Sequence, residues 1–228
     1  MKASDYFTLP ASLAPFAAYF AADLRPWEWL PQIRPALESW NFVAAVQTVP
    51  AGVRIEGPVY LHPTVRLPAY ATIIGPVWIG PETRIAPGAF IRGNVIAGAN
   101  CVLGNSCEYK QCLLMDKVET AHFNYVGDSI LGSRSHLGAG AICANLRLDR
   151  KPVVVQGPEG PIPTGLRKFG AIIGEEAEVG CNAVLNPGTL LGRRSLVMPA
   201  MAYGGCLPEA MIARSARSAV SLIPRRGV

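Results

Sequence analysis

The chain has 228 residues, of which 50% are apolar and only 16% are charged, and it contains 23 glycines and 20 prolines. This length and apolar content allow one domain with a sizeable core. The low charge and the many turn-forming residues argue against a helical bundle. The formal charge of +5 either favours anionic partners such as phosphates or serves solubility alone. Because the chain has no Lys/Arg-rich run with interleaved aromatics, nucleic acid is not expected as a partner.

Neither the first residues nor the cysteines indicate export or membrane insertion. Met1 to Asp5 lead into no apolar signal segment, and the apolar stretch from Leu13 to Ala22 is short and interrupted by Pro15. None of the six cysteines forms a CxxC pair, and several fall at repeat positions expected to be buried. They are therefore interpreted as small apolar fillers in a reducing cytoplasm.

Residues 1–48 form the first predicted unit, a helical N-terminal cap. The segments 12–22 and 26–45 have helical character, and Pro26 stands near the first turn of the second, where proline is tolerated. We expect this unit to close the exposed end of the domain that follows, since an end coil carries unpaired backbone groups. Its aromatic residues are interpreted as an apolar packing face, with substrate or partner binding as the alternative: Trp27, Trp29, Trp40 and Phe42.

Residues 49–206 repeat with a period of six. Every sixth residue from Ile55 to Leu103 is a branched aliphatic in eight of nine cases, and a small or β-branched residue stands two positions earlier. Alternate residues of a strand share one face, so each pair points inward together. The period returns from Leu131 and again from Ile173 to Val197. Extended hexads separated by tight turns predict an all-β fold, a parallel β-helix, rather than chance alternation in an ordinary β-sandwich.

Two segments interrupt the period, and both are predicted to be loops that leave the scaffold. The first runs from Gln111 to Gly127 and the second from Leu146 to Phe169. Loops on a rigid scaffold often carry function. The basic tail, residues 207–228, has four arginines and is interpreted as a short helix, a disordered end or a phosphate clamp: Arg214, Arg217, Arg225 and Arg226.

An ordered set of polar motifs carries the most chemical information. Glu108-Tyr109-Lys110 is followed by the segment from His122 to Asp128, and then by Asn145 and Lys168. From residue 53 to about 200 the chain resembles the left-handed β-helix (hexapeptide-repeat) acyltransferases. Within them, it resembles the acetyltransferase domain of the bifunctional enzymes that make UDP-N-acetylglucosamine. The long loop before Lys168 is most similar to the archaeal-type sugar-1-phosphate nucleotidylyltransferase/acetyltransferase.

The resemblance implies a left-handed parallel β-helix with three hexads to a coil, a homotrimer, and acetyl-CoA as co-substrate without a metal. It implies that His122 is the general base, since imidazole titrates near neutral pH. Glu108 corresponds to a polar group near the amino sugar and Asn145 to a residue beside the reacting amine and thioester. The residues implied to bind the sugar phosphate are Arg92, Lys110, Tyr125, His136 and Lys168. Those implied to lie along the CoA path are Ala139, Cys181 and Arg214.

The chain departs from the bacterial pattern at two of these positions. His136 stands where that pattern has Asn, which puts the sugar contacts in question, and Cys181 stands where it has Ser, which removes a hydroxyl from the CoA path. Asp128 is predicted to be a turn residue that bonds its own backbone. No Gly-rich nucleotidyltransferase segment precedes the repeat, so a separate nucleotidyltransferase is a candidate partner.

The resemblance implies an enzyme that transfers an acetyl group from acetyl-CoA to glucosamine-1-phosphate or galactosamine-1-phosphate, in nucleotide-sugar synthesis. One alternative is a non-catalytic scaffold or sugar-phosphate-binding protein. Another is a γ-type carbonic anhydrase, which needs three histidine ligands around an open metal site. The chain has three histidines, but their spacing does not resemble that family's pattern: His62, His122 and His136.

Overall fold

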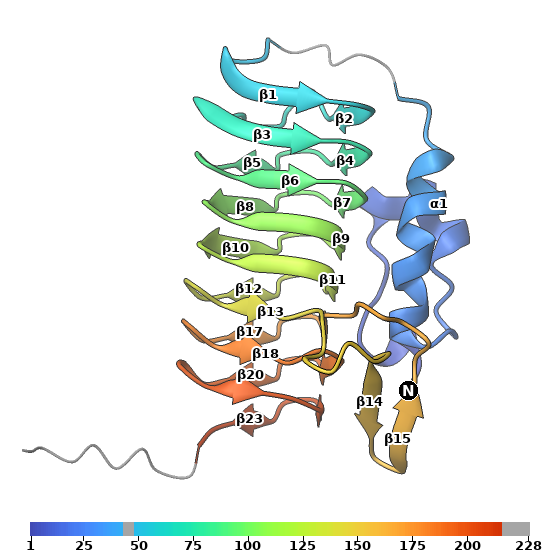
Figure 1. The fold of residues 1–228 in the computed structure, drawn as a ribbon. Coiled ribbons are helices and arrows are strands. Elements are labelled where there is room, and N and C mark those ends of the chain that lie inside the picture. The colour runs from blue at the N-terminus through green and yellow to red at the C-terminus, as the bar shows by residue number, and fades with distance from the viewer. Residues whose placement is uncertain (43–47, 216–228) are drawn as a thin grey trace, which may run out of the picture.

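The computed structural model describes residues 1–42 and 48–215 and shows a parallel β-helix of about nine turns (Figure 1). The prediction of an all-β, parallel β-helix is confirmed. Arg217, Arg225 and Arg226 of the predicted tail, and the end of the expected helix 26–45, lie outside the described residues. In the parts of the chain that the structure covers, no helix has both the length and the apolarity needed to span a membrane.

Three strand stacks form the faces of the β-helix, and each strand pairs in parallel with its equivalents in the coils before and after it. The first face contains β1 (Gly52–Glu56), β3 (Tyr70–Ile74), β6 (Phe90–Arg92), the first halves of β9 (Glu108–Leu114) and β11 (Tyr125–Leu131), β13 (Ile142–Cys143), β18 (Val184–Leu185) and β21 (Ala202–Tyr203). The second face contains β2 (Val59–Leu61), β4 (Val77–Ile79), β7 (Val95–Ala97), the second halves of β9 and β11, β16 (Ala171–Ile173), β19 (Thr189–Leu191) and β22 (Cys206–Leu207). The third face contains β5 (Arg84–Ile85), β8 (Val102–Asn105), β10 (Glu119–His122), β12 (His136–Leu137), β17 (Glu178–Val179), β20 (Leu196–Val197) and β23 (Ile212–Ala213).

The hexad pattern produces this fold because its aliphatic positions stack inside the coil. Val77 pairs with Val95, three hexads further along, so equivalent side chains lie above one another in successive coils. Ile73, Ile79 and Ile85, one from each face of a single coil, are at most 1% exposed. Each rung adds its inward side chains to one continuous core, and neighbouring rungs lie about 4.8 Å apart.

The prediction of a loop at 111–127 is wrong, because this segment forms β9, β10 and β11 of the β-helix. One corner contains Gly93 and Asn94, whereas the same corner of the next coil contains only Gln111. Gln111 adopts a left-handed φ of 48°, and its N–H donates to the Gly93 carbonyl at 3.0 Å. The shorter corner shifts the sequence period by one residue while strand pairing continues. The interrupted period therefore led to the prediction of a loop.

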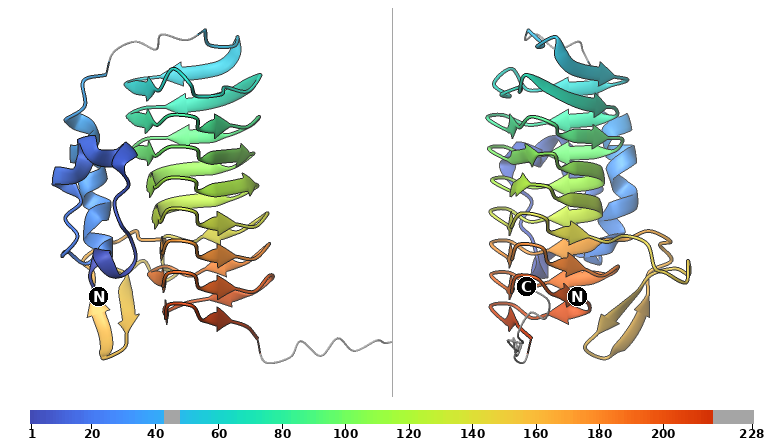
Figure 2. Two further views of the ribbon diagram at one scale, coloured as in Figure 1. Left: turned by 180° about the vertical axis from the view of Figure 1, so that it is seen from behind. Right: turned by 60° about the vertical axis from the view of Figure 1, so that its left-hand side comes forward.

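The second predicted loop is confirmed between β13 and β16, where residues 146–168 leave the β-helix (Figure 2). It contains an antiparallel hairpin of β14 (Val154–Gly157) and β15 (Gly160–Pro163). The coils pair across the insertion, since Ile142 lies opposite Val184. Val153 and Val155 are fully buried in the cluster formed by the N-terminal residues, which anchors the hairpin.

The N-terminal segment is helical, as predicted, but it lies along the side of the β-helix rather than over its first coil (Figures 1 and 2). It comprises three 3₁₀ helices and one α-helix: η1 (Ala3–Asp5), η2 (Ala11–Tyr19), η3 (Pro26–Gln32) and α1 (Ile33–Glu38). Phe16 packs edge-on against Trp78 of β4, with ring centroids 5.4 Å apart. The second face attracts this segment because its outward side chains are apolar, and six of them are buried in the same cluster as the N-terminal residues: Trp78, Ile96, Leu113, Ile130, Ile172 and Leu190.

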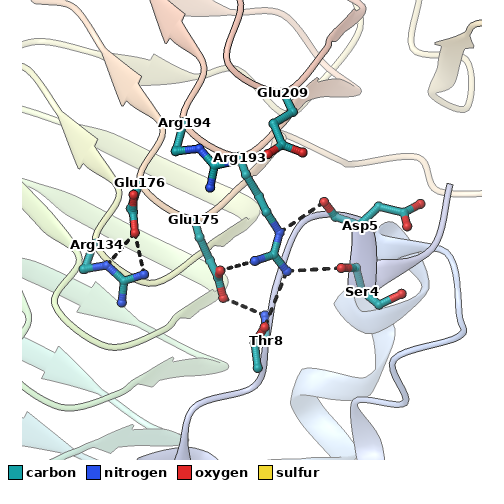
Figure 3. A network of polar contacts seen from close by, with 9 residues as sticks. All are labelled: Ser4, Asp5, Thr8, Arg134, Glu175, Glu176, Arg193, Arg194 and Glu209. Carbon is teal, nitrogen blue, oxygen red and sulfur yellow. Dashed lines mark hydrogen bonds and ion pairs between the residues drawn. The ribbon is translucent and has the colours of Figure 1, made fainter.

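A polar network fastens the start of the N-terminal segment to a corner of the β-helix (Figure 3). Arg193 forms an ion pair with Glu175 and donates to the backbone carbonyls of Ser4 and Asp5 at 3.1 and 3.3 Å. The Thr8 N–H donates to the Glu175 carboxylate at 2.6 Å. The Arg193 and Glu175 side chains are only 21% and 12% exposed, so removing one partner would leave the other charge largely buried.

We therefore expect Arg193→Ala to lower the free energy of unfolding by about 3 kcal/mol, the lower end of the range for breaking a buried ion pair. The matched control is Arg134→Ala. Its pair with Glu176 stands nearby (Figure 3) but is 51% and 42% exposed, so we expect a loss below about 1 kcal/mol. Urea unfolding measures both values. Equal losses in the two variants would contradict the anchoring role of Arg193.

Candidate active site

Four predicted site residues project from adjacent strands of the first face. Arg92 ends β6, Glu108 and Lys110 lie on β9, and Tyr125 begins β11. Their strand neighbours Ile91, Tyr109 and Val126 are fully buried, so alternation turns the four polar side chains outward. The register places Phe90 opposite Glu108 and Glu108 opposite Tyr125. Arg92 Nε donates to Glu108 Oε1 at 2.7 Å, which pairs the guanidinium with the carboxylate.

A second cluster occupies the corner between the first and second faces. Lys110 Nζ donates to Asp128 Oδ2 at 3.1 Å, and Asn145 Nδ2 donates to the same oxygen at 2.5 Å. Asn145 Nδ2 also donates to the Tyr125 hydroxyl at 3.0 Å. Asp128 has a left-handed φ of 48°, as suits a turn residue. The prediction that it bonds its own backbone misses these contacts, because the partners come from neighbouring coils.

The Tyr125 side chain depends on the glycine two residues further along its strand. A Cβ atom on Gly127 would lie 2.4 Å from the Tyr125 hydroxyl, so only glycine leaves room for the ring to lie against β11. Burial, and then the carboxylates of Asp128 and Glu108, raise the pKa of the Tyr125 phenol above its usual value. The phenol is therefore neutral near pH 7 and keeps an O–H that it can donate.

His122 lies at the opposite edge of the first face, at the corner where β10 passes into β11. Its side chain is exposed, and its ring centroid is 6.4 Å from that of Phe123. The corner is tied to the next coil by Asn124, which is 2% exposed and whose Nδ2 donates to the Gly138 carbonyl at 2.7 Å. Sequence reasoning did not single out Asn124, because its role depends on a contact between coils.

The residues predicted for the CoA path follow the same corner as His122. The Gly140 N–H donates to the His122 carbonyl at 2.9 Å, and the Asn182 N–H donates to the Ala139 carbonyl at 2.8 Å. His122, Ala139 and Cys181 therefore occupy one line along the β-helix. Arg214 directly follows β23, which pairs with β20, and this places it further along the same corner. Four cysteines are buried as predicted, whereas Cys181 is exposed.

Lys168 lies near the Asp128 corner, and His136 does not. Lys168 is exposed and precedes Phe169, whose N–H donates to the Asn145 carbonyl at 2.9 Å. His136 faces outward on the third face, in register with Glu119 on one side and Glu178 on the other. Within one chain, His136 is thus separated from the cluster around Arg92 and Lys110.

The three histidines do not meet within one chain. His62 follows β2 and contacts Thr64, His122 ends β10, and His136 begins β12. Across residues 1–42 and 48–215, no three side chains of the His, Cys, Asp or Glu type gather closely enough to hold a metal ion.

Comparison with known proteins places the chain in a family. Residues 73–200 match the model of the GMPPB C-terminal domain. The chain is 40% identical over 108 residues to the "Bifunctional protein GlmU" of Methanococcus maripaludis, covering 47% of this chain and 26% of that protein. It is 34% identical over 175 residues to a bifunctional sugar-1-phosphate nucleotidylyltransferase/acetyltransferase of Sulfurisphaera tokodaii, covering 77% of this chain and 44% of that protein. The chain thus spans less than half the length of either relative.

Among solved structures, a hexapeptide transferase family protein from Anaplasma phagocytophilum aligns with a TM-score of 0.30 and 17% identity, covering 73% of this chain and 86% of that one. The assignment rests on the family model and on the sequence relatives, which confirm the resemblance seen in the motifs. The chain belongs to the family of the GMPPB C-terminal domain.

Proposed function

We propose that this protein transfers an acetyl group from acetyl-CoA to the amine of an amino-sugar 1-phosphate, either glucosamine-1-phosphate or galactosamine-1-phosphate. The observation that carries the proposal is the cluster on the first face. It joins two cations, a neutral phenol and an amide across four successive coils, with His122 at the edge of the same face. The name of one relative, a bifunctional sugar-1-phosphate nucleotidylyltransferase/acetyltransferase, supports the same chemistry.

In the proposed reaction, His122 acts as general base. The sugar amine attacks the thioester carbonyl, so a C–N bond forms and the C–S bond breaks. His122 accepts the proton that the amine loses and can return it to the departing CoA thiolate. Its exposed ring leaves the imidazole accessible to a substrate. Backbone N–H groups would stabilise the oxyanion, and no covalent acyl-enzyme is needed.

The sugar phosphate would bind between the two edges of the first face. Arg92, Lys110 and Lys168 offer cationic donors to the phosphate, and charge-assisted hydrogen bonds of this kind are the strong ones. Tyr125 can donate to a sugar hydroxyl, and Glu108 can accept a hydrogen bond from the sugar. Without ligand, Arg92 and Lys110 are held by Glu108 and Asp128, so both cations are already directed before the phosphate arrives.

The CoA arm would lie along the corner that begins at His122. Ala139 and Cys181 follow in successive coils, and Arg214 stands four rungs from the coil of His122. At about 4.8 Å a rung this line is roughly 19 Å long, which suits a long, thin molecule. Small side chains along the line leave space for the pantetheine arm, and Arg214 provides a cation for a CoA phosphate.

We further propose a homotrimer in the cytoplasm, in which a neighbouring chain completes the site. The N-terminal segment covers the second face, whereas the first face carries the site and the third face presents His136. Static light scattering at micromolar concentration should give the mass of three 24.3 kDa chains. A monomer at that concentration would contradict the trimer. We also propose that a separate nucleotidyltransferase uses the acetylated product.

A thiol-release assay tests the activity itself. Acetyl-CoA is supplied with a panel of amino-sugar phosphates and with the same sugars lacking phosphate. We expect CoA release only with a 1-phosphate that carries a free amine, and no release when the amine is already acetylated. Absence of release across the whole panel would overturn the proposal. If the sugar phosphate still bound, as titration calorimetry can measure, the protein would be a non-catalytic binding protein instead.

A further inference from the structure

The Asp128 carboxylate is the central acceptor of the corner cluster, although no role was expected for it beyond the turn. Its residue is only 7% exposed. One oxygen, Oδ2, accepts from both Lys110 Nζ at 3.1 Å and Asn145 Nδ2 at 2.5 Å. These partners come from the coil before and from the coil after, so Asp128 links three successive coils at the edge of the site.

The charge of Asp128 determines which way the Asn145 amide points. An ionised carboxylate can only accept hydrogen bonds, so the amide atom that faces it must be the nitrogen. The second N–H of the same nitrogen is directed to the Tyr125 hydroxyl at 3.0 Å. With both N–H groups engaged, Oδ1 is the amide atom left to accept a hydrogen bond from a ligand. A flipped amide would put its oxygen against Asp128 and Tyr125 and present N–H groups instead.

We propose that Asp128 is a positioning residue for acetyl transfer, which acts by holding Asn145 with Oδ1 available to the bound amino sugar. This inference rests on the proposed function. A sugar hydroxyl that donates to Asn145 Oδ1 sets how the sugar lies on the first face and so where its amine stands, and a misplaced reacting group can cost about 100-fold in rate. The link to Lys110 would act separately, on the binding of the sugar phosphate.

Asp128→Asn separates this role from a turn role. Asparagine is as tolerant of a left-handed φ as aspartate, so the turn at φ 48° is preserved while the charge is lost. We expect kcat to fall about 10- to 100-fold with the melting temperature nearly unchanged. The matched control is Asp116→Asn. Asp116 also stands at a corner, where it accepts from the Ala99 N–H at 2.8 Å and from Ser12 Oγ. Its loss should leave kcat unchanged.

A double-mutant cycle tests whether Asp128 acts through Asn145. In an Asn145→Ala background, Asp128→Asn should lower kcat no further, because the amide that it orients is gone. A purely structural role would lower kcat by the same factor in both backgrounds. That result, or wild-type kcat in Asp128→Asn, would overturn the proposal.

A readout independent of turnover distinguishes failure of this inference from failure of the proposed function. The side-chain amide protons of Asn145, observed by ¹⁵N-resolved NMR of the intact protein, should shift in Asp128→Asn and not in Asp116→Asn. If the wild-type protein released no CoA with any amino-sugar phosphate, the acetyltransferase proposal would fail. The Asn145 resonances would still test whether Asp128 holds the Asn145 amide. Unchanged Asn145 resonances in Asp128→Asn would overturn the orienting role of Asp128.

Discussion

Replacing His122 by alanine should lower kcat by roughly 10²- to 10⁴-fold, the usual range for a lost general base. The effect should fall on kcat rather than on the KM for the sugar phosphate, because the phosphate contacts belong to Arg92, Lys110 and Lys168. Folding should be nearly unaffected, since the His122 side chain is exposed and exposed substitutions usually change stability by less than about 0.5 kcal/mol. Steady-state kinetics of CoA release, together with light scattering and a melting curve, measure these quantities.

His62→Ala is the matched control for His122→Ala. His62 is also an accessible corner histidine, but it follows β2 near the start of the β-helix and contacts Thr64. We expect wild-type kinetics from this variant. Wild-type turnover in His122→Ala, on a substrate that the native protein acetylates, would remove His122 from the mechanism. The remaining candidates would then be Glu108 or a base-free transfer driven by positioning alone.

Lys168→Ala should show the opposite division, with a KM for the sugar phosphate about 10- to 100-fold higher and a much smaller change in kcat. A hydrogen bond to a charged group contributes about 1.5–3 kcal/mol, and each 1.4 kcal/mol is about tenfold in affinity. The structure places Lys168 one residue before Phe169, whose N–H is bonded to the Asn145 carbonyl. Its backbone is therefore fixed at the corner while its side chain is exposed.

Lys151→Ala provides the control for Lys168→Ala. Lys151 is an exposed lysine of the same inserted loop, and its backbone N–H donates to the Asp149 carboxylate. The Lys151→Ala variant therefore loses the same single positive charge as Lys168→Ala. Its KM should match that of the wild type. A KM that rises equally in both variants would show that only the overall charge matters, and an unchanged KM in Lys168→Ala would remove Lys168 from phosphate binding.

The fold could be predicted from the sequence because the hexad pattern within each coil determines which of its own side chains point inward. Ile73, Ile79 and Ile85 fall six residues apart and point inward on three successive faces. Strand alternation alone determines that direction, and stacking of equivalent rungs needs no long-range rearrangement. The same alternation turned Arg92, Glu108, Lys110 and Tyr125 outward, so their common face followed from their spacing once the coil was recognised.

Two features of the fold were not predicted from the sequence. One depends on the length of a corner between strands, and the other on the outward surface of the β-helix. At 111–127 a single residue fewer at Gln111 shifts the sequence period, although the strands on either side stay paired. The N-terminal segment was expected over the first coil, yet it covers the outward apolar side chains of the second face, such as Trp78 and Leu113. These side chains alternate with the inward ones along each strand. Only when the coils are stacked do they form one continuous apolar surface.

By itself, the sequence determined the repeat, the inward residues and the order of the polar motifs, because each depends on neighbours within one coil. Only the tertiary structure decided that Lys110, Asp128 and Asn145 meet at one oxygen, and that His122 stands in line with Ala139 and Cys181. Such contacts join different coils. Their geometry depends on the length of each corner and on the register between rungs, so a change of one residue at a corner alters which side chains meet.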